Sequence, residues 1–186
     1  MFRRRSESKP TPVYVAVPPD DQLRRFLDDA QTFNGVAAGE VVGLHARLRE
    51  DERVFRHVQR AFLIEPPGDS NNGRVGEPPQ RVDRGEFVVT TTRALFTGTK
   101  QIRQWVWANL VEIEHAARGP WTLMRVSDRQ RTFGVLYDED DRIDVRFGIE
   151  LAVAIAQGNR EAFIHHLNDE LERVRGRLPQ DKIPEG

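Results

Sequence analysis

Apolar and polar residues alternate along short stretches of the chain from residue 82 onward, and glycine, proline or polar residues bound each stretch. A period of two is typical of strands that bury one face, and the short gaps between the stretches favour antiparallel neighbours. The expected strands are 87–91, 94–97, 101–107, 110–114, 121–126, 131–137 and 143–147. The last depends on the alternation of Ile143, Val145 and Phe147, with the acidic residues 138–141 as the turn before it. About seven short strands joined by tight turns predict an antiparallel sandwich or a small barrel.

Residues 53–65 fit two periods. Val54, Val58 and Phe62 suit one face of a helix or one face of a strand, with Arg56 and Arg60 interrupting the strand pattern. The apolar end of this segment, followed by Pro66, favours a strand there. The proline-rich residues 66–81 follow as a loop, and loops of this length are often functional.

Apolar residues at helical spacing predict helices on both sides of the strands. A helix is expected over 20–33, with Asp20 as its N-cap and Asn34-Gly35 as its end. A weaker stripe predicts a helix over 39–49, although Gly39 and Gly43 disfavour it. Helices over 149–156 and 162–174 are expected to be separated at Gly158-Asn159.

These elements divide the 186 residues into one domain with extensions. The expected organisation is a flexible arm over 1–19, a helical extension over 20–49, a barrel with its capping helix over 50–176 and a tail over 177–186. The fold class is α+β.

Composition removes several kinds of chemistry. The chain has no cysteine, which excludes disulfides, thiol nucleophiles and iron–sulfur clusters. The formal net charge of −1 gives no overall attraction to nucleic acid, which is therefore not an expected partner. The basic start of the chain leads into no apolar stretch typical of a secretory signal, and a cytoplasmic location is expected.

A segment within the strand region carries a recognisable pattern. Residues 85–98 read GEFVVTTTRALFTG, in which Thr90, Arg93 and Phe96 stand between two glycines. This segment resembles the G-x-x-x-x-T-x-x-R-x-x-F-x-G hairpin of GRAM and other bacterial pleckstrin-homology-like domains, and residues 105–113 resemble the next hairpin. The resemblance covers about residues 50–175. It implies a small, partly open antiparallel barrel with a C-terminal helix at one end, and no catalytic activity. Some members of the family bind phosphoinositides or proteins.

The candidate binding residues are cationic or indole side chains in the hairpin region. The basic ones are expected at neighbouring hairpin ends, and Trp105 and Trp107 are expected on one face of a strand. We expect both indoles to be buried, or one of them to contact a partner. The full set is Arg93, Lys100, Arg103, Trp105, Trp107, Arg125, Arg129 and Arg131.

No reactive constellation is visible in the sequence. The five histidines lack the spacing of a helical zinc site, no serine lies in a nucleophile elbow, and residues 138–149 lack the glycine and glutamate of a calcium loop. No catalytic residue, metal ligand or cofactor is therefore expected.

The expected function is that of a non-enzymatic module which binds a protein or peptide in a bacterial cytoplasm. One alternative is peripheral binding to anionic lipid headgroups through the arginine-rich hairpin tips. The other alternative is an enzyme whose site has no recognisable sequence motif.

Overall fold

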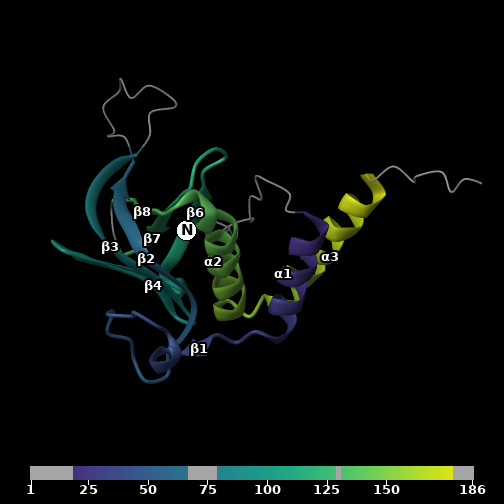
Figure 1. Cartoon of the computed structure of the whole chain (residues 1–186), viewed down its shortest axis with the longest axis horizontal. Coiled ribbons are helices and arrows are strands. Elements are labelled where there is room, and N and C mark those ends of the chain that lie inside the picture. The colour runs from purple at the N-terminus through teal and green to yellow at the C-terminus, as the bar shows by residue number, and fades with distance from the viewer. Residues whose placement is uncertain (1–18, 67–78, 129–130, 178–186) are drawn as a thin grey trace, which may run out of the picture.

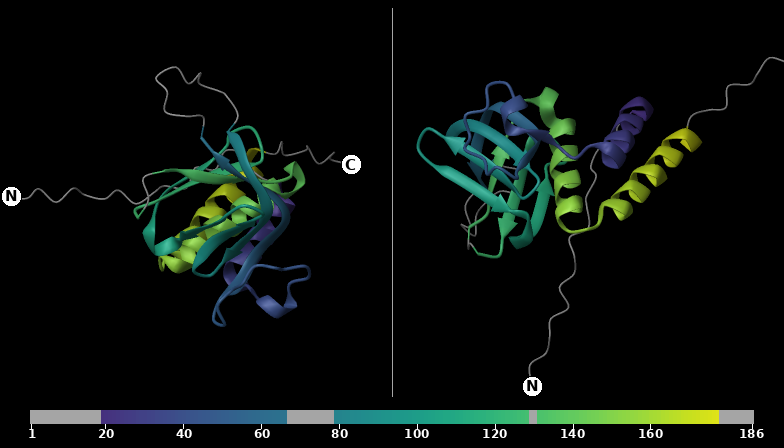
Figure 2. Two further views of the ribbon diagram at one scale, coloured as in Figure 1. Left: turned by 90° about the vertical axis from the view of Figure 1, so that its left-hand side faces the viewer. Right: turned by 90° about the horizontal axis from the view of Figure 1, so that it is seen from below.

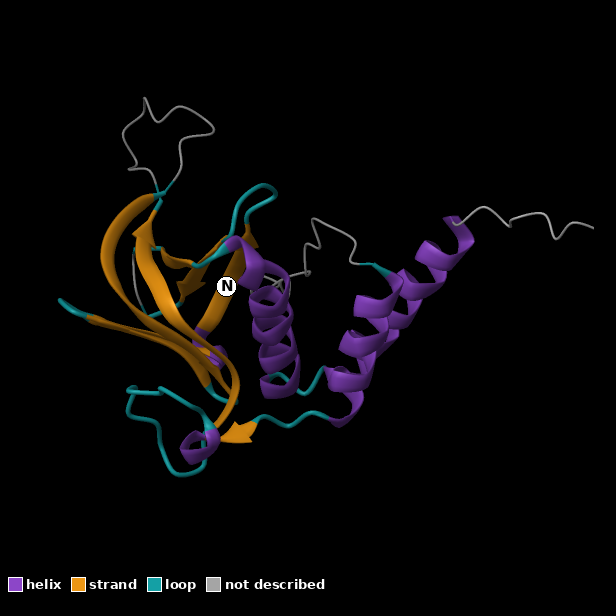
Figure 3. Ribbon diagram, in the orientation of Figure 1, coloured by secondary structure: helices purple, strands orange, loops and turns teal. Residues whose placement is uncertain are grey.

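The computed structural model describes residues 19–66, 79–128 and 131–177, which form an antiparallel sheet and three α-helices (Figures 1 and 3). The expected arm over 1–19 except Pro19, most of the loop over 66–81 and the tail over 177–186 except Arg177 lie outside the described residues. The helices and 3₁₀ turns are α1 (Asp20–Thr32), η1 (Ala38–Glu40), η2 (Trp107–Asn109), η3 (Glu139–Asp141), α2 (Arg142–Ala156) and α3 (Arg160–Arg177). The strands are β1 (Val36–Ala37), β2 (Arg53–Glu65), β3 (Gln80–Thr90), β4 (Arg93–Gly98), β5 (Ile102–Val106), β6 (Leu110–His115), β7 (Trp121–Val126) and β8 (Phe133–Leu136).

The strands form one eight-stranded antiparallel sheet with the order β5-β4-β3-β2-β8-β7-β6, and β1 pairs with β2 off this path. The sheet is not closed, because its end strands β5 and β6 do not pair with each other. The long strand β2 pairs with β3 and, through Phe62–Ile64, also with β8. Register shifts interrupt the β2–β3 pairing between Val58 and Ala61 and at two other places, and such bulges bend and twist a strand. The segment 53–65 is thus strand throughout, and the α+β class with an antiparallel sheet is confirmed.

Helix α2 occupies the segment where the last strand was expected, so that prediction was wrong. The partly exposed polar residues Arg142, Asp144 and Arg146 alternate with Ile143, Val145 and Phe147, so the first turns of α2 show a period of two in the sequence although their backbone is helical. The helix expected over 149–156 is confirmed, because it is the second half of α2. The acidic residues 138–141 do not form a hairpin tip either, since η3 leads directly into α2. Their negative charge is favourable beside the positive N-terminal end of that helix.

The expected helix over 39–49 is also wrong beyond the short turn η1, so the helical extension over 20–49 is helical mainly in α1. The stripe residues Val41, Leu44 and Leu48 do pack against a small second core, which contains Val88 and is separate from the main core. The backbone that carries them is irregular, and Gly43 adopts a φ of 73° that a helix does not allow. The apolar spacing therefore predicted correctly that these side chains are packed, but not the conformation of their backbone.

The helices form two layers beside the sheet. Figure 1 shows α2 against the hollow side of the sheet, with α1 and α3 on the far side of α2, and Figure 2 shows the same order from below. The ring of Phe26 on α1 stacks on Phe147 of α2, with 4.0 Å between centroids. At one end of the α1–α3 pair, Arg160 donates to the carbonyl oxygens of Ala30 and Phe33. At the other end, Arg175 Nε lies 3.6 Å from Asp20 Oδ1.

The β4–β5 turn depends on a buried carboxylate. Asp83 accepts hydrogen bonds from the backbone N–H of Lys100 and Gln101 and from the Thr99 hydroxyl, at 2.8–3.0 Å. Burial opposes the charge of Asp83, but these donors and the Arg84 N–H outweigh it and lower the pKa of the carboxyl to about 2 from 3.8.

We expect Asp83→Asn to destabilise the protein by about 2 kcal/mol at pH 7, because an amide replaces one of the two accepting oxygens with a donor. Since the pKa of Asp83 is lower in the folded state, its contribution is complete above about pH 4 and is lost as the pH falls toward 2. Urea unfolding of both proteins at pH 7 and pH 3 measures this. A difference in the free energy of unfolding that stays constant between the two pH values would contradict the expectation.

Candidate functional site

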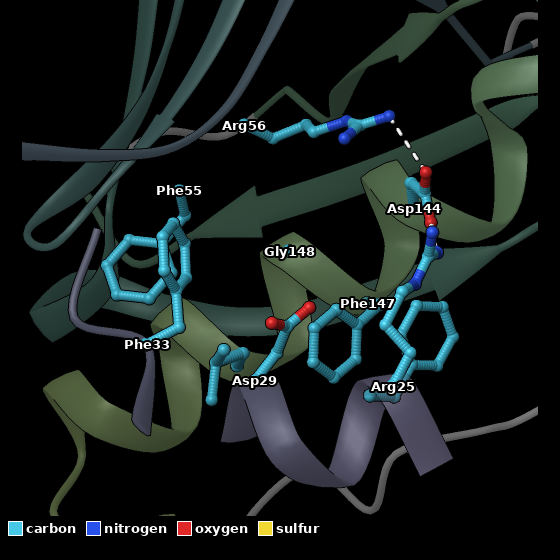
Figure 4. Close-up of a pocket in the computed structure, with 10 residues that line it drawn as sticks. Arg25, Asp29, Phe33, Phe55, Arg56, Asp144, Phe147 and Gly148 are labelled. Atoms are coloured by element: carbon cyan, nitrogen blue, oxygen red, sulfur yellow. Dashed lines mark hydrogen bonds and ion pairs between the residues drawn. The ribbon is translucent and has the colours of Figure 1, made fainter. Parts of the chain in front are cut away.

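A pocket opens where α1, α2 and β2 meet. It is lined by Arg25, Phe26, Asp29, Phe33, Phe55, Arg56, Asp144, Phe147, Gly148 and Leu151. Figure 4 shows the side chains of Arg25, Arg56 and Asp144 grouped at one end, and those of Phe33 and Phe55 at the other. The pocket therefore has a charged end and an aromatic end.

The local sequence explains why these residues share one space. Asp144, Phe147, Gly148 and Leu151 recur three and four residues apart and so lie on one face of α2. A register shift in β2 between Val54 and Arg56 marks the place where Phe55 and Arg56 both line the pocket, and bulges commonly redirect side chains. Gly148 leaves room opposite them, because a Cβ at this position would lie 3.3 Å from the Cβ of Arg56.

Both arginines of the pocket are already paired. Arg56 Nη2 lies 3.0 Å from Asp144 Oδ2 and 3.5 Å from Asp141 Oδ1, and Arg25 forms an ion pair with the other oxygen of Asp144. Among the described residues, no hydrogen bond or ion pair reaches the carboxylate of Asp29, which is half-buried. Burial raises the pKa of Asp29, Arg25 opposes this, and Asp28 and Asp144 add to it. Asp29 is thus the carboxylate of the pocket whose charge is least compensated.

The volume of the pocket is about 190 Å³. Pockets for drug-sized small molecules usually have about 300–1,000 Å³. A cavity of about 150 Å³ is enough for one benzene ring. This pocket therefore suits a group as large as one side chain.

The structure does not bring the sequence-predicted residues into one site. Arg93 and Lys100 stand at opposite ends of β4, because Arg93 follows the β3–β4 turn and Lys100 lies in the β4–β5 turn. Arg125 pairs with Glu112 at 2.9 Å, and the guanidinium of Arg103 lies 4.3 Å from the centroid of the Phe133 ring. Arg131 is exposed, and Arg129 lies outside the described residues.

Both predicted indoles are buried, so neither is presented to a partner. Trp105 and Trp107 are 2% and 1% exposed. Trp105 Nε1 donates to the carbonyl oxygen of Met124 on β7, and Trp107 Nε1 donates to that of Thr90 on β3. Trp107 begins η2 rather than continuing β5, so the two residues are not on one strand as expected. These hydrogen bonds join β5 to β7 and η2 to β3.

A second polar cluster is enclosed between β6, β7 and α2. His115 Nδ1 is 2.8 Å from the hydroxyl of Thr122, which is 2.9 Å from Tyr137 Oη, and His115 Nε2 is 3.2 Å from Glu150 Oε1. Thr122 is fully buried and the other three residues are at most 8% exposed. The series carboxylate–imidazole–hydroxyl resembles a catalytic triad, but all of its side chains are buried and none is accessible to a substrate.

Across the described residues, no group of three or more histidine, aspartate or glutamate side chains is arranged to hold a metal ion. None of their helices is long and apolar enough to cross a membrane.

Sequence reasoning missed the pocket residues Arg25, Asp29, Arg56 and Asp144. They come from three elements that are far apart in the chain, and only Arg56 left a signal. A cation in the middle of an apolar strand pattern needs a nearby carboxylate or an opening to solvent, and Arg56 has Asp144.

No family model matches the chain, and no curated protein matches its sequence. Among solved structures, the chain is similar to inner membrane complex sub-compartment protein 3 of Toxoplasma gondii, with 12% sequence identity and a TM-score of 0.28. This similarity covers 63% of the chain and 76% of the other protein. At this TM-score the similarity defines neither a shared architecture nor a shared function.

Proposed function

We propose that the protein is a non-enzymatic interaction module of the pleckstrin-homology-like, GRAM-like class, which binds a protein or peptide in a bacterial cytoplasm. The pocket between α1, α2 and β2 receives one side chain of the partner. The observation that carries the proposal is a pocket of one side chain's volume with an aromatic end and a charged end. Pockets of this kind receive the central residues that dominate protein–protein binding energies.

The composition of the pocket supports binding more than catalysis. Acid–base or nucleophilic catalysis needs at least one free reactive group placed beside a second one. Two carboxylates line the pocket, but both oxygens of Asp144 are held by Arg25 and Arg56, which leaves Asp29 alone. The lining residues include no serine, threonine, histidine, lysine or tyrosine.

The lipid alternative stays a prediction with less support. Of the predicted basic residues, Arg93 and Arg125 are paired with glutamates and Arg103 stacks on Phe133. Lys100 and Arg131 are exposed, but two basic side chains are fewer than the cluster that typically binds an anionic lipid surface.

The test uses a phage-displayed library of random peptides, selected on the immobilised full chain. Gly148→Leu is expected to abolish binding of the selected peptides, because the added side chain extends from α2 into the pocket. Gly39→Leu is the matched control, since a Cβ at Gly39 meets no atom within 4 Å. Thermal unfolding verifies that both variants fold, and Gly148→Ala replaces Gly148→Leu if the latter does not.

Selected peptides that share one residue type and require the open pocket would support the proposal. Peptides that bind equally well to both leucine variants would overturn it, as would the absence of any enriched peptide. Flotation with vesicles containing anionic lipid tests the alternative, because attraction to the vesicle surface weakens with salt.

A further inference from the structure

Asp29 indicates which kind of side chain the pocket accepts. Figure 4 shows its carboxylate extending from α1 into the pocket, with Phe33 and Phe147 on either side. The two guanidiniums of the pocket are matched by the carboxylates of Asp141 and Asp144 with which they pair. Arg25 is near enough to attract Asp29, but its ion pair is with Asp144. Together with Asp141, which lies beside the pocket lining, these five charged side chains have a formal net charge of −1.

From this geometry we infer that the pocket binds a cationic side chain of a partner peptide, with arginine preferred, and that Asp29 is its counter-ion. The inference rests on the proposed function and makes it more specific. A guanidinium donates to a carboxylate through two parallel N–H groups. Its planar face also stacks on aromatic rings.

The aromatic end of the pocket suits the rest of such a side chain. Phe33 and Phe55 meet edge to face with 5.5 Å between centroids, and Phe147 lies on the other side of Asp29. The methylene groups of an arginine pack on apolar surface while its charged end remains hydrogen-bonded. Cations also gain from the negative face of phenyl rings when water is excluded. The fold already contains this arrangement elsewhere, with Arg81 over Phe62 at 4.4 Å and Arg103 over Phe133 at 4.3 Å.

Other classes of side chain fit less well. An apolar side chain would cover Asp29 without supplying a donor, and a buried carboxylate without a partner is costly. An acidic side chain would have to displace Asp144 from Arg25 and Arg56 while lying beside the charge of Asp29. Charge complementarity therefore selects a cation.

The test compares two capped tripeptides, Gly-Arg-Gly and Gly-citrulline-Gly, by NMR titration of the full chain. Citrulline has nearly the shape of arginine and no charge. We expect the arginine peptide to shift the amide signals of residues around the pocket and to bind at least about tenfold more tightly than the citrulline peptide. Asp29→Asn is expected to remove this preference, because it keeps the shape of the side chain and deletes its charge.

Asp28→Asn is the matched control, since Asp28 is the exposed neighbour of Asp29 on α1 and does not line the pocket. Equal binding of the two peptides, or a preference for arginine that survives Asp29→Asn, would overturn the inference. In the phage experiment, the selected peptides could share an apolar residue and lose binding to Gly148→Leu. This result would refute the preference for a cationic side chain and leave the peptide-binding function intact. An Asp29-dependent arginine preference without any selected peptide would refute the peptide-binding function while leaving the cation site intact.

The chain's own Arg3, Arg4 and Arg5 are a competing cation source, and a full-length variant with all three changed to glutamine tests them. An unchanged Kd for the arginine peptide supports a separate partner. A markedly lower Kd would mean that the chain occupies its own pocket and would overturn the assignment to a partner.

Discussion

Replacing Arg93 by alanine is expected to lower the free energy of unfolding by about 3–5 kcal/mol at pH 7. Arg93 Nε lies 2.8 Å from Glu52 Oε1 and its Nη2 lies 2.9 Å from Oε2, while the side chain of Glu52 is 0% exposed. The variant would leave a carboxylate buried without its cation. The remaining donors to Glu52 are the hydroxyls of Thr90 and Thr92 and the Arg49 N–H, none of which carries a charge.

Arg125→Ala is the control for this prediction. It removes another guanidinium that is paired with a glutamate on a strand, but Glu112 is 60% exposed and the pair is in contact with solvent. Exposed pairs of this kind contribute at most about 1 kcal/mol. Equal losses in the two variants, measured by urea unfolding, would show that the Glu52–Arg93 pair is not buried as described.

The effect of Arg93→Ala should also depend on pH. In the native protein burial alone would raise the pKa of Glu52, but the hydrogen bonds from Arg93 and Thr92 outweigh it and hold the pKa below 4.5. The contribution of Glu52 is therefore present above pH 4.5 and is lost as the pH falls through the lower pKa of the folded state. Without Arg93, the largest of the causes that lower the pKa of Glu52 is lost, so this pKa rises from its native, lowered value. The stability deficit of the variant is then greatest at neutral pH and smaller near about pH 4.

Gly85→Ala is expected to cost at least about 3 kcal/mol, at the upper end of the range for overpacked positions. Gly85 pairs with Gly98 across the β3–β4 hairpin. A Cβ at Gly85 would lie 2.0 Å from the carbonyl oxygen of Thr97 and 2.6 Å from the Cα of Gly98. Both are backbone atoms, so β3 and β4 would have to separate at this pair.

Gly39→Ala is the corresponding control, because its Cβ would meet nothing within 4 Å. We expect this variant to unfold within about 0.5 kcal/mol of the native protein, as most exposed substitutions do. Thermal and urea unfolding of the three proteins give the comparison. If Gly85→Ala were as stable as Gly39→Ala, the close approach of β3 and β4 at this pair would be wrong.

Most of the strands after residue 82 were predictable because each has its own local signal, whereas β1 was not predicted and the segment of β2 fitted two periods. The alternation in 121–126 predicts β7, and the turn residues after Gly98 and around Gly119 predict where the neighbouring strands end and begin. All of these signals depend only on residues that are neighbours in the chain. The second half of α2 was predicted as the helix over 149–156, but its first turns were not. There Arg142, Asp144 and Arg146 alternate with apolar residues, so the sequence has the period of a strand and only the packing of α2 between the sheet and α1 makes the helix evident. The prediction of a helix over 39–49 was wrong for a different reason. The apolar residues have helical spacing, but Gly43 adopts a positive φ that is incompatible with a helix.

The candidate site was much less predictable than the fold. The emphasis on arginine and tryptophan selected residues by chemical type, and the structure shows most of them in internal contacts, such as Arg93 with Glu52 and Trp105 with Met124. The pocket instead depends on Asp29, Arg56 and Asp144, which lie up to 115 residues apart in sequence and meet only after folding. Whether Asp29 is paired cannot be read from its neighbours in the chain.

The antiparallel contact between α1 and α3 has a consequence for biosynthesis. Leu23 and Phe26 are buried only when α3 and α2 are present, and Arg160, which holds the C-terminal end of α1, follows it by about 130 residues. All eight strands are therefore synthesised before α2 and α3, the native neighbours of α1. The apolar face of α1 stays uncovered during most of translation. A nascent chain stalled before residue 160 should thus be a good client for a chaperone, whereas the finished chain should not.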